Sequence, residues 1–425
     1  MITLVFILGL FVLLMIGVPV AYSLGFTSLF VMIIERGIDA IPHLVLSQRM
    51  LYGINKFPTL AIPCFLLVGN LMNTVGISQR IFRFANKLVG HLYGGLAHAN
   101  VIASIIFAGM SGSAVGDAAG LGTVEIEAMK DAGYPGDFSA AITGSSSMIG
   151  PIIPPSVPMV FYGILAGVSV TRLFIGGIIP GLLMGVGMMI WIRYQAKKHS
   201  YPREEFDREA LWESFKKAFF PLWTPIILVG GIWTGIFTPT EAAAVAVLYV
   251  LILGFAYNKL TTKILLNVFN KTVRDTSVLL FILAVGFLYG WMIVRLRIPN
   301  TILNFFVSHI SSPTAAMFIL VGFFLVLGCF LSVVVTINIT VPILLPIIAY
   351  YGIDPLHFGI IMIVTLMLGV LTPPFGNVLY VLLRVSGVPF GKLVKKTFSS
   401  AIPVLIVILL LMLFPKIVMF LPSIL

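Results

Sequence analysis

Charged residues are scarce in this 425-residue sequence: Asp, Glu, Lys and Arg make up 10%, against about 25% in an ordinary soluble domain. Hydrophobic residues make up 59%, and the mean hydropathy is +1.10. This composition excludes a soluble enzyme and a nucleic-acid-binding protein. It is typical of a chain that crosses a lipid bilayer repeatedly, where each spanning helix needs about 20 apolar residues.

Metal and nucleotide motifs are also missing. Cys64 and Cys329 lie in apolar stretches and predict neither a disulfide nor a metal site. The six histidines have no metal-ligand spacing, and there is neither an HExxH motif nor the P-loop that an ATP-driven pump needs. We therefore expect no enzyme, no organic cofactor and no transition metal.

The N-terminus has no basic segment and no small-residue cleavage site, so residues 2–17 predict an uncleaved first helix.

Further along the chain, sequence landmarks recur at an offset of 219 or 220 residues. The matching pairs are Pro19 and Pro239, Pro154 and Pro373, and Gly167 and Gly387. A constant offset over this length predicts two homologous halves, about 1–198 and 219–425, joined by a charged segment.

The same order of helices is predicted in both halves. Two short helices precede an amphipathic arm, a spanning helix and a second amphipathic stretch; in the second half the arm (260–272) and the spanning helix (275–293) are expected to be separate. An apolar hairpin interrupted by small polar residues follows, at 93–131 and 313–351. A helix broken by prolines comes next, at 135–166 and 355–385, and a last helix closes each half.

The hairpins decide the predicted topology. Their arms barely reach spanning length, and their polar tips would be costly beside lipid, so we interpret them as re-entrant. The predicted fold is an all-α polytopic membrane protein of two inverted repeats, each with five crossings, one re-entrant hairpin and one broken helix. Hairpins that crossed fully would instead give six crossings and parallel halves.

Lys and Arg orient this topology, because these residues concentrate on the cytoplasmic side of membrane proteins. On the five-crossing plan 19 of the 26 fall on one face, which is therefore expected to be cytoplasmic and to carry the linker 196–220. Both termini are expected outside. The net charge of +11 is thus explained by topology, without a nucleic-acid partner.

The two breaks are the strongest functional signal. Proline removes an N–H and displaces a carbonyl of the preceding turn, so clustered prolines expose oxygens that a bound Na⁺ can use. The predicted first sodium site consists of Ser111, Ser113, Gly150, Ile153 and Pro155. The repeat maps the second site to Ser332, Val334, Gly369, Thr372 and Pro374. The alternative is that the prolines only kink a helix.

Substrate-binding candidates surround these breaks. Asp117 either faces a cavity or satisfies the dipole of a helix that begins near Ala114. Arg297 either meets an organic anion or faces lipid headgroups. The remaining candidates are Ser145, Ser156 and Asn377. Glu241, by contrast, is expected to close a capping box with Thr238.

Five motifs in order resemble the large membrane subunit of the TRAP (tripartite ATP-independent periplasmic) transporters. They are Met110–Ala119, Gly133–Pro135, Gly150–Ser156, Thr238–Ala243 and Thr372–Pro374. The resemblance implies a carrier of the bacterial inner membrane with an elevator mechanism and Na⁺ as the coupling ion, so that the outer face, where the Lys and Arg count puts both termini, is the periplasm. It also implies two partners, a small four-helix membrane subunit and a periplasmic substrate-binding protein. Similar proteins commonly have an acidic residue where this chain has Ser332, which removes a carboxylate from the second site.

The elevator plan divides the chain into scaffold (1–91 and 221–310), transport domain (92–195 and 311–425) and an amphipathic linker (196–220). The expected function is Na⁺-coupled import of a small organic anion, such as sialic acid or a C4-dicarboxylate, through the bilayer. Two alternatives stay open. One is a single-component Na⁺/dicarboxylate carrier, and the other is an intramembrane hydrolase using Ser113 and Asp117.

Overall fold

The computed structural model describes residues 2–37 and 43–424, and within them all regular structure is helical. Eight of the described helical stretches are long and apolar enough to cross a membrane. The prediction of an all-α polytopic membrane protein is therefore confirmed. Both arms of the second hairpin belong to these eight, so length alone does not distinguish re-entrant from spanning arms, and the inversion of the repeats stays a prediction.

The first half begins with helices that turn at prolines. Gly17, at φ +87°, and Pro19 separate α1 from α2, and Pro58 opens the short turn η2 before α4. Their bounds are α1 Ile2–Met15, α2 Val20–Arg36, α3 His43–Ile54, η2 Phe57–Leu60, α4 Ala61–Val75 and α5 Ile77–Val89.

The first hairpin and the first broken helix follow. The hairpin consists of α6 (Gly95–Ser111), α7 (Ala114–Ala119) and α8 (Leu121–Asp131), with its tip at Gly112 and Ser113. The broken helix consists of α9 (Gly136–Ser147) and α10 (Val157–Ala166), and α11 (Val170–His199) closes the half. The non-helical break, residues 148–156, holds the three prolines that the sequence places there.

The second half differs from the expectation at one element. α15 is a single helix, Thr262–Arg295, where a separate arm (260–272) and spanning helix (275–293) were predicted. That prediction was wrong because this half has Arg274 and Asp275 at the junction, whereas the first half has Pro58, which interrupts a helix. The preceding elements are α12 Arg208–Pro225, η3 Ile226–Gly230, α13 Gly231–Trp233 and α14 Pro239–Ala256.

The chain ends with the second hairpin and the second broken helix. After α16 (Ile298–His309), the hairpin consists of α17 (Pro313–Phe330) and α18 (Val333–Tyr350). The broken helix consists of α19 (Pro355–Gly369) and α20 (Asn377–Ser386), and the last elements are α21 Phe390–Leu413, α22 Lys416–Met419 and η4 Leu421–Ser423. The Pro154–Pro155 and Pro373–Pro374 bonds are both cis.

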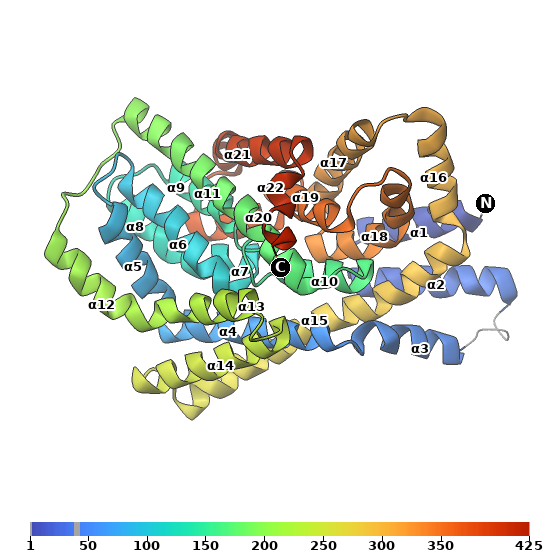
Figure 1. The fold of residues 1–425 in the computed structure, drawn as a ribbon, viewed down its shortest axis with the longest axis horizontal. Coiled ribbons are helices and arrows are strands. Elements are labelled where there is room, and N and C mark those ends of the chain that lie inside the picture. The colour runs from blue at the N-terminus through green and yellow to red at the C-terminus, as the bar shows by residue number, and fades with distance from the viewer. Residues whose placement is uncertain (1, 38–42, 425) are drawn as a thin grey trace.

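The long helix α15 crosses the lower part of the molecule diagonally in Figure 1, and it packs against α2, α3 and α4. Beyond it lie the two broken helices, and α9 and α19 also pack against α21. One large hydrophobic core joins both halves. The hairpins reach α15 and α4 directly, since α18 packs on α15 and α6 packs on α4.

The linker between the halves is tied to the first half by polar contacts. Glu204 accepts hydrogen bonds from Lys87 at 2.7 Å and Asn86 at 2.8 Å. Partial burial opposes the ionised form of Glu204, but these hydrogen bonds and the charge of Lys87 hold its pKa below the ordinary value. Tyr134 donates to the carbonyl of Pro202 at 2.7 Å, and burial raises the Tyr134 pKa to about 12.

Candidate functional site

The tip of the first hairpin lies directly on the first break. Ser113 caps α7 by accepting a hydrogen bond from the Gly116 N–H at 3.2 Å. Gly112 takes φ +61°, and a Cβ atom there would lie 2.6 Å from the Pro155 carbonyl oxygen. Only glycine suits this position, because it combines a left-handed backbone with close backbone contact.

Behind the tip, Ser111 donates its hydroxyl hydrogen bond to Asp117 Oδ1, and both side chains are buried. The other carboxylate oxygen, Oδ2, has no hydrogen-bond partner, and a Cβ atom on Gly150 would lie 2.3 Å from it. Asp117 lies in the first turn of α7, as the dipole interpretation expects. Its side chain also faces the break, so hairpin and break meet around a carboxylate.

The first break exposes carbonyl oxygens in a buried place. Every residue from 148 to 156 is buried. Ser156 caps α10 and donates to the Pro151 carbonyl at 2.5 Å. No hydrogen bond from a described residue reaches the carbonyl oxygens of Ile153, Pro154 or Pro155. Unpaired oxygens of this kind are suitable ligands for a hard monovalent cation.

The second tip and the second break are also joined through the backbone. The Phe375 N–H donates to the Cys329 carbonyl at 3.1 Å, and Gly328 and Gly369 pack backbone to backbone. A Cβ atom on Gly376 would lie 2.7 Å from the Val370 carbonyl oxygen and 2.9 Å from that of Thr372, so these two oxygens converge.

The predicted ligands of the second site are partly engaged elsewhere. Thr372 donates its hydroxyl to Leu368 at 2.8 Å, and the Pro374 carbonyl accepts the Tyr380 hydroxyl at 3.0 Å. Ser332 precedes α18 and forms no side-chain cap. This break is also more open than the first, because Pro374 and Asn377 are exposed.

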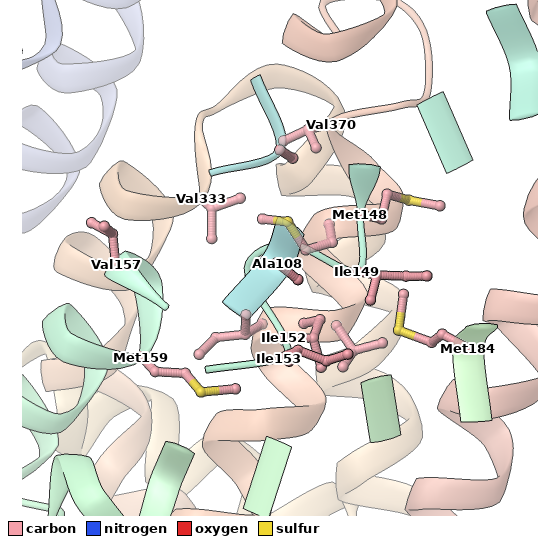
Figure 2. Close-up of a cluster of buried hydrophobic side chains, with 14 of the residues drawn as sticks. Ala108, Met148, Ile149, Ile152, Ile153, Val157, Met159, Met184, Val333 and Val370 are labelled. Carbon is pink, nitrogen blue, oxygen red and sulfur yellow. The ribbon is translucent and has the colours of Figure 1, made fainter. Parts of the chain in front are cut away.

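A cavity of about 180 Å³ lies between the two tips. Its lining combines both hairpin tips, both breaks and the helices α4 and α15. The polar side chains in this lining are those of Ser113, Ser332 and Asn377, and its apolar members include Leu66, Leu279 and Ile282. Gly112, Pro151 and Val334 also line the cavity, at the tips and the first break. Figure 2 shows that hydrophobic side chains of the second half, Val333 and Val370, lie in one cluster with those around the first break.

Four helices begin at the wall of this cavity. Ser113 and Ala114 start α7, Val157 starts α10, Val333 starts α18 and Asn377 starts α20. The first N–H groups of a helix have no partner within it, and the helix dipole places positive charge there. No Lys or Arg lines the cavity among the described residues. The helix N-termini are therefore the feature of this lining that favours an anion.

The remaining predicted residues lie elsewhere. Ser145 points to α21, where its hydroxyl lies 2.7 Å from that of Ser400, and Arg297 is exposed at the start of α16. Neither lines the cavity. The capping box of Thr238 and Glu241 is confirmed, with the Thr238 N–H donating to Glu241 at 2.8 Å.

Two buried polar groups near the site, Asn100 and Asn338, were not among the residues predicted from the sequence. Asn100 donates to Thr143 at 2.7 Å and accepts from Ser146 at 2.6 Å, which ties α6 to α9. Asn338, the repeat equivalent of Asp117, donates to the Ile282 carbonyl at 3.4 Å and so connects the second hairpin to α15. Each is the only amide side chain of an apolar helix. Burying such a polar group within a membrane protein is costly, and this cost was the signal that the sequence offered.

Comparison with known proteins identifies the family. Residues 7–417 match the family model described as the tripartite ATP-independent periplasmic transporter, DctM component. The chain belongs to this family. A TRAP large permease subunit is a transporter component of the bacterial inner membrane, which is not an enzyme class, and the family works with a small membrane subunit and a periplasmic binding protein.

Relatives within the TRAP family cover nearly the whole chain. The sialic acid TRAP transporter large permease protein SiaM of Vibrio cholerae is 41% identical, with 96% of this chain and 95% of the relative covered. The 2,3-diketo-L-gulonate TRAP transporter large permease protein YiaN of Escherichia coli is 34% identical, with 90% of each covered. The C4-dicarboxylate TRAP transporter large permease protein DctM of Pseudomonas aeruginosa is 36% identical, with 89% of this chain and 88% of the relative covered.

Solved structures with little sequence identity share the fold. The YdaH transporter of Alcanivorax borkumensis superposes with a TM-score of 0.62 at 11% identity, over 89% of this chain and 90% of that one. The MtrF protein of Neisseria gonorrhoeae gives a TM-score of 0.57 at 12% identity, over 89% of this chain and 85% of that one. These likenesses concern the fold alone.

Proposed function

We propose that this TRAP large subunit imports a small organic anion together with Na⁺, and that the anion binds in the cavity between the two hairpin tips. The observation that carries the proposal is the start of four helices at the wall of a cavity whose described lining has no cationic side chain. Helix N-termini favour anions, and bound cations beside the cavity add the charge that the side chains lack.

The cation sites are proposed at the two tips. At the first, the free carbonyls of the break and the Ser111 hydroxyl supply oxygen ligands. The hydroxyl proton points to Asp117, which leaves the oxygen lone pairs available. At the second, the Thr372 carbonyl is added to the predicted set, together with the Val370 carbonyl that converges with it and also accepts a hydrogen bond from the Val378 N–H at 3.2 Å. Bound Na⁺ supplies positive charge to the substrate and holds each tip on its break.

The substrate class follows from the relatives only in outline. Their names include sialic acid, 2,3-diketo-L-gulonate and C4-dicarboxylate, which share an acidic group and small size. A small organic anion is therefore proposed here, delivered by a periplasmic binding protein to a complex with a small membrane subunit. In the proposed orientation both termini face the periplasm and the linker faces the cytoplasm.

Movement of the hairpins against the scaffold is the proposed transport step. Support comes from glycines at the contact, since small residues let helices approach and slide. A Cβ atom on Gly69 of α4 would lie 3.4 Å from the Ser111 Cα, and one on Gly286 of α15 would lie 2.6 Å from the Asn338 Cγ. In each half the contact joins the hairpin to a helix of the scaffold, through α6 in the first half and through α18 in the second.

The test of the cavity uses its polar lining. Asn377→Val, assayed in the reconstituted complex, is expected to raise the substrate KM at least several-fold while leaving stabilisation by Na⁺ unchanged. Ser332→Val is expected to raise the KM and also to weaken stabilisation by Na⁺, because Ser332 belongs to the predicted second sodium site as well as to the cavity lining. Ser145→Val, which removes a buried hydroxyl away from the cavity, serves as control. Unchanged KM in both cavity variants would exclude this cavity.

A single-component Na⁺/dicarboxylate carrier differs from the proposed TRAP permease because it needs no partner protein for transport. The proposed TRAP permease transports only when the periplasmic binding protein is added. Transport by the chain without that protein, at the same rate, would favour the single-component carrier.

A further inference from the structure

Glu125 is a buried acidic residue that neither the cation sites nor the anion site uses. It lies on α8, the returning arm of the first hairpin, and is 1% exposed. Its Oε1 atom has no hydrogen-bond partner, and the ion pairs of the described residues do not include it. A carboxylate without a counter-charge is among the most costly groups to bury in a membrane protein.

The groups around Glu125 do not neutralise it. α8 packs against α5, α6, α7, α9 and α20. The facing charge on α7 is Asp117, which has the same sign. The other titratable or charged residues of these helices are Arg80, Arg83 and Lys87 on α5, His98 on α6, Asp137 on α9, and Tyr380 and Arg384 on α20. Among the described contacts none of them hydrogen-bonds to Glu125 or pairs with it.

The neighbouring polar side chains are already engaged. Gly122, one turn before Glu125, packs against Thr143, since a Cβ atom there would lie 2.7 Å from the Thr143 Cγ2. The Thr143 hydroxyl accepts from Asn100, which in turn accepts from Ser146. A metal cation would need several converging oxygens, whereas a proton needs only one carboxyl oxygen.

We propose that Glu125 binds a proton within the first hairpin. The proton forms one O–H bond with the carboxyl group and requires no further reactant. The hairpin then carries at most one carboxylate charge, that of Asp117, in place of two. This inference is independent of Na⁺ coupling; if the hairpin moves as proposed above, the proton moves with it.

Infrared spectroscopy of the full chain in lipid bilayers tests the proton directly. At neutral pH we expect a carbonyl stretching band of a protonated carboxylic acid in the wild type. The band should be lost in Glu125→Gln and kept in Glu127→Gln, an exposed neighbour on the same helix. It should also remain in Asp117→Asn. Absence of the band from the wild type, or its persistence in Glu125→Gln, would overturn the proposal.

Thermal unfolding against pH provides a second readout. In the unfolded chain Glu125 is exposed to water and loses its proton above about pH 4.3, whereas the folded hairpin keeps it. Glu125 should therefore make the Tm of the wild type fall as the pH rises from the acid range, until the folded protein also loses the proton. Glu125→Gln, which mimics the neutral acid in both states, should lose this dependence and should have a higher Tm than the wild type at neutral pH. Parallel pH profiles for the two proteins would contradict the proposal. If Glu125→Gln does not fold, absence of the band from the wild type still overturns the proposal, and loss of the band in Asp117→Asn or Glu127→Gln would assign the proton to another acid and overturn it too.

Discussion

The Pro155 carbonyl oxygen lies against Gly112, so the first hairpin tip and the first break meet through their backbones. Any side chain at position 112 would collide with that oxygen while adopting a left-handed conformation. This contact is the basis for placing a cation between the two segments.

Gly112→Ala is expected to destabilise the protein by about 1–2 kcal/mol from the left-handed backbone alone. Displacement of the Pro155 carbonyl should also weaken stabilisation by Na⁺. Thermal unfolding with and without Na⁺ measures both effects. Gly322→Ala is the matched control, because Gly322 lies in α17 with open space around its Cα. Equal Na⁺ stabilisation of Gly112→Ala and wild type would argue against a cation at this tip.

Ser111→Ala and Asp117→Asn are both expected to reduce the Tm increase that Na⁺ produces. Ser111 loses a ligand, and Asp117→Asn removes the acceptor that orients the Ser111 hydroxyl. Because the two side chains act through one hydrogen bond, the double variant should lose little more than either single variant. Additive losses would show that the two residues act separately.

Acid is expected to release the linker. The pKa of Glu204 is lower in the folded protein than its ordinary value. Its contribution to stability is therefore present when the pH is above the ordinary pKa, and is lost as the pH falls through the lower pKa of the folded protein. Limited proteolysis of residues 199–207 should therefore accelerate in acid. Glu204→Gln should already be sensitive at neutral pH, whereas Glu205→Gln, an exposed neighbour, should resemble the wild type. Equal cleavage of both variants at neutral pH would show that the tether contributes nothing.

A cysteine at Lys198 tests the orientation. With Cys64 and Cys329 replaced, Lys198→Cys in intact cells should resist a membrane-impermeant thiol reagent, because the end of α11 is proposed to be cytoplasmic. Arg297→Cys, proposed to face the periplasm, should react. Both positions are exposed on the chain itself. Labelling of Lys198→Cys from outside would exclude the five-crossing inverted plan.

The helix breaks could be predicted from the sequence because their cause is local. Clustered prolines cannot continue a helix, and the described helices end and restart around Pro151 and Pro373. The second half showed the limit of repeat reasoning. α15 is continuous because the proline that interrupts the first half has no counterpart there.

Side-chain direction was less predictable, because it depends on distant partners. Every residue from Phe138 to Ser147 is buried, so no polar face indicates that Ser145 points to α21. Arg297 has an exposed position that its neighbours in sequence do not reveal. Glu125 could have been noticed as an acid in an apolar arm, but its lack of a partner is a tertiary property.

Uptake by the reconstituted complex is the most direct test of Na⁺ coupling at the paired tips. The assay uses proteoliposomes with both membrane subunits, the periplasmic binding protein, and the ligand found for that protein by thermal-shift screening. Replacing external Na⁺ by K⁺ or choline at constant ionic strength should abolish uptake, and restoring Na⁺ should recover it. Uptake that continues unchanged without Na⁺ would contradict the account.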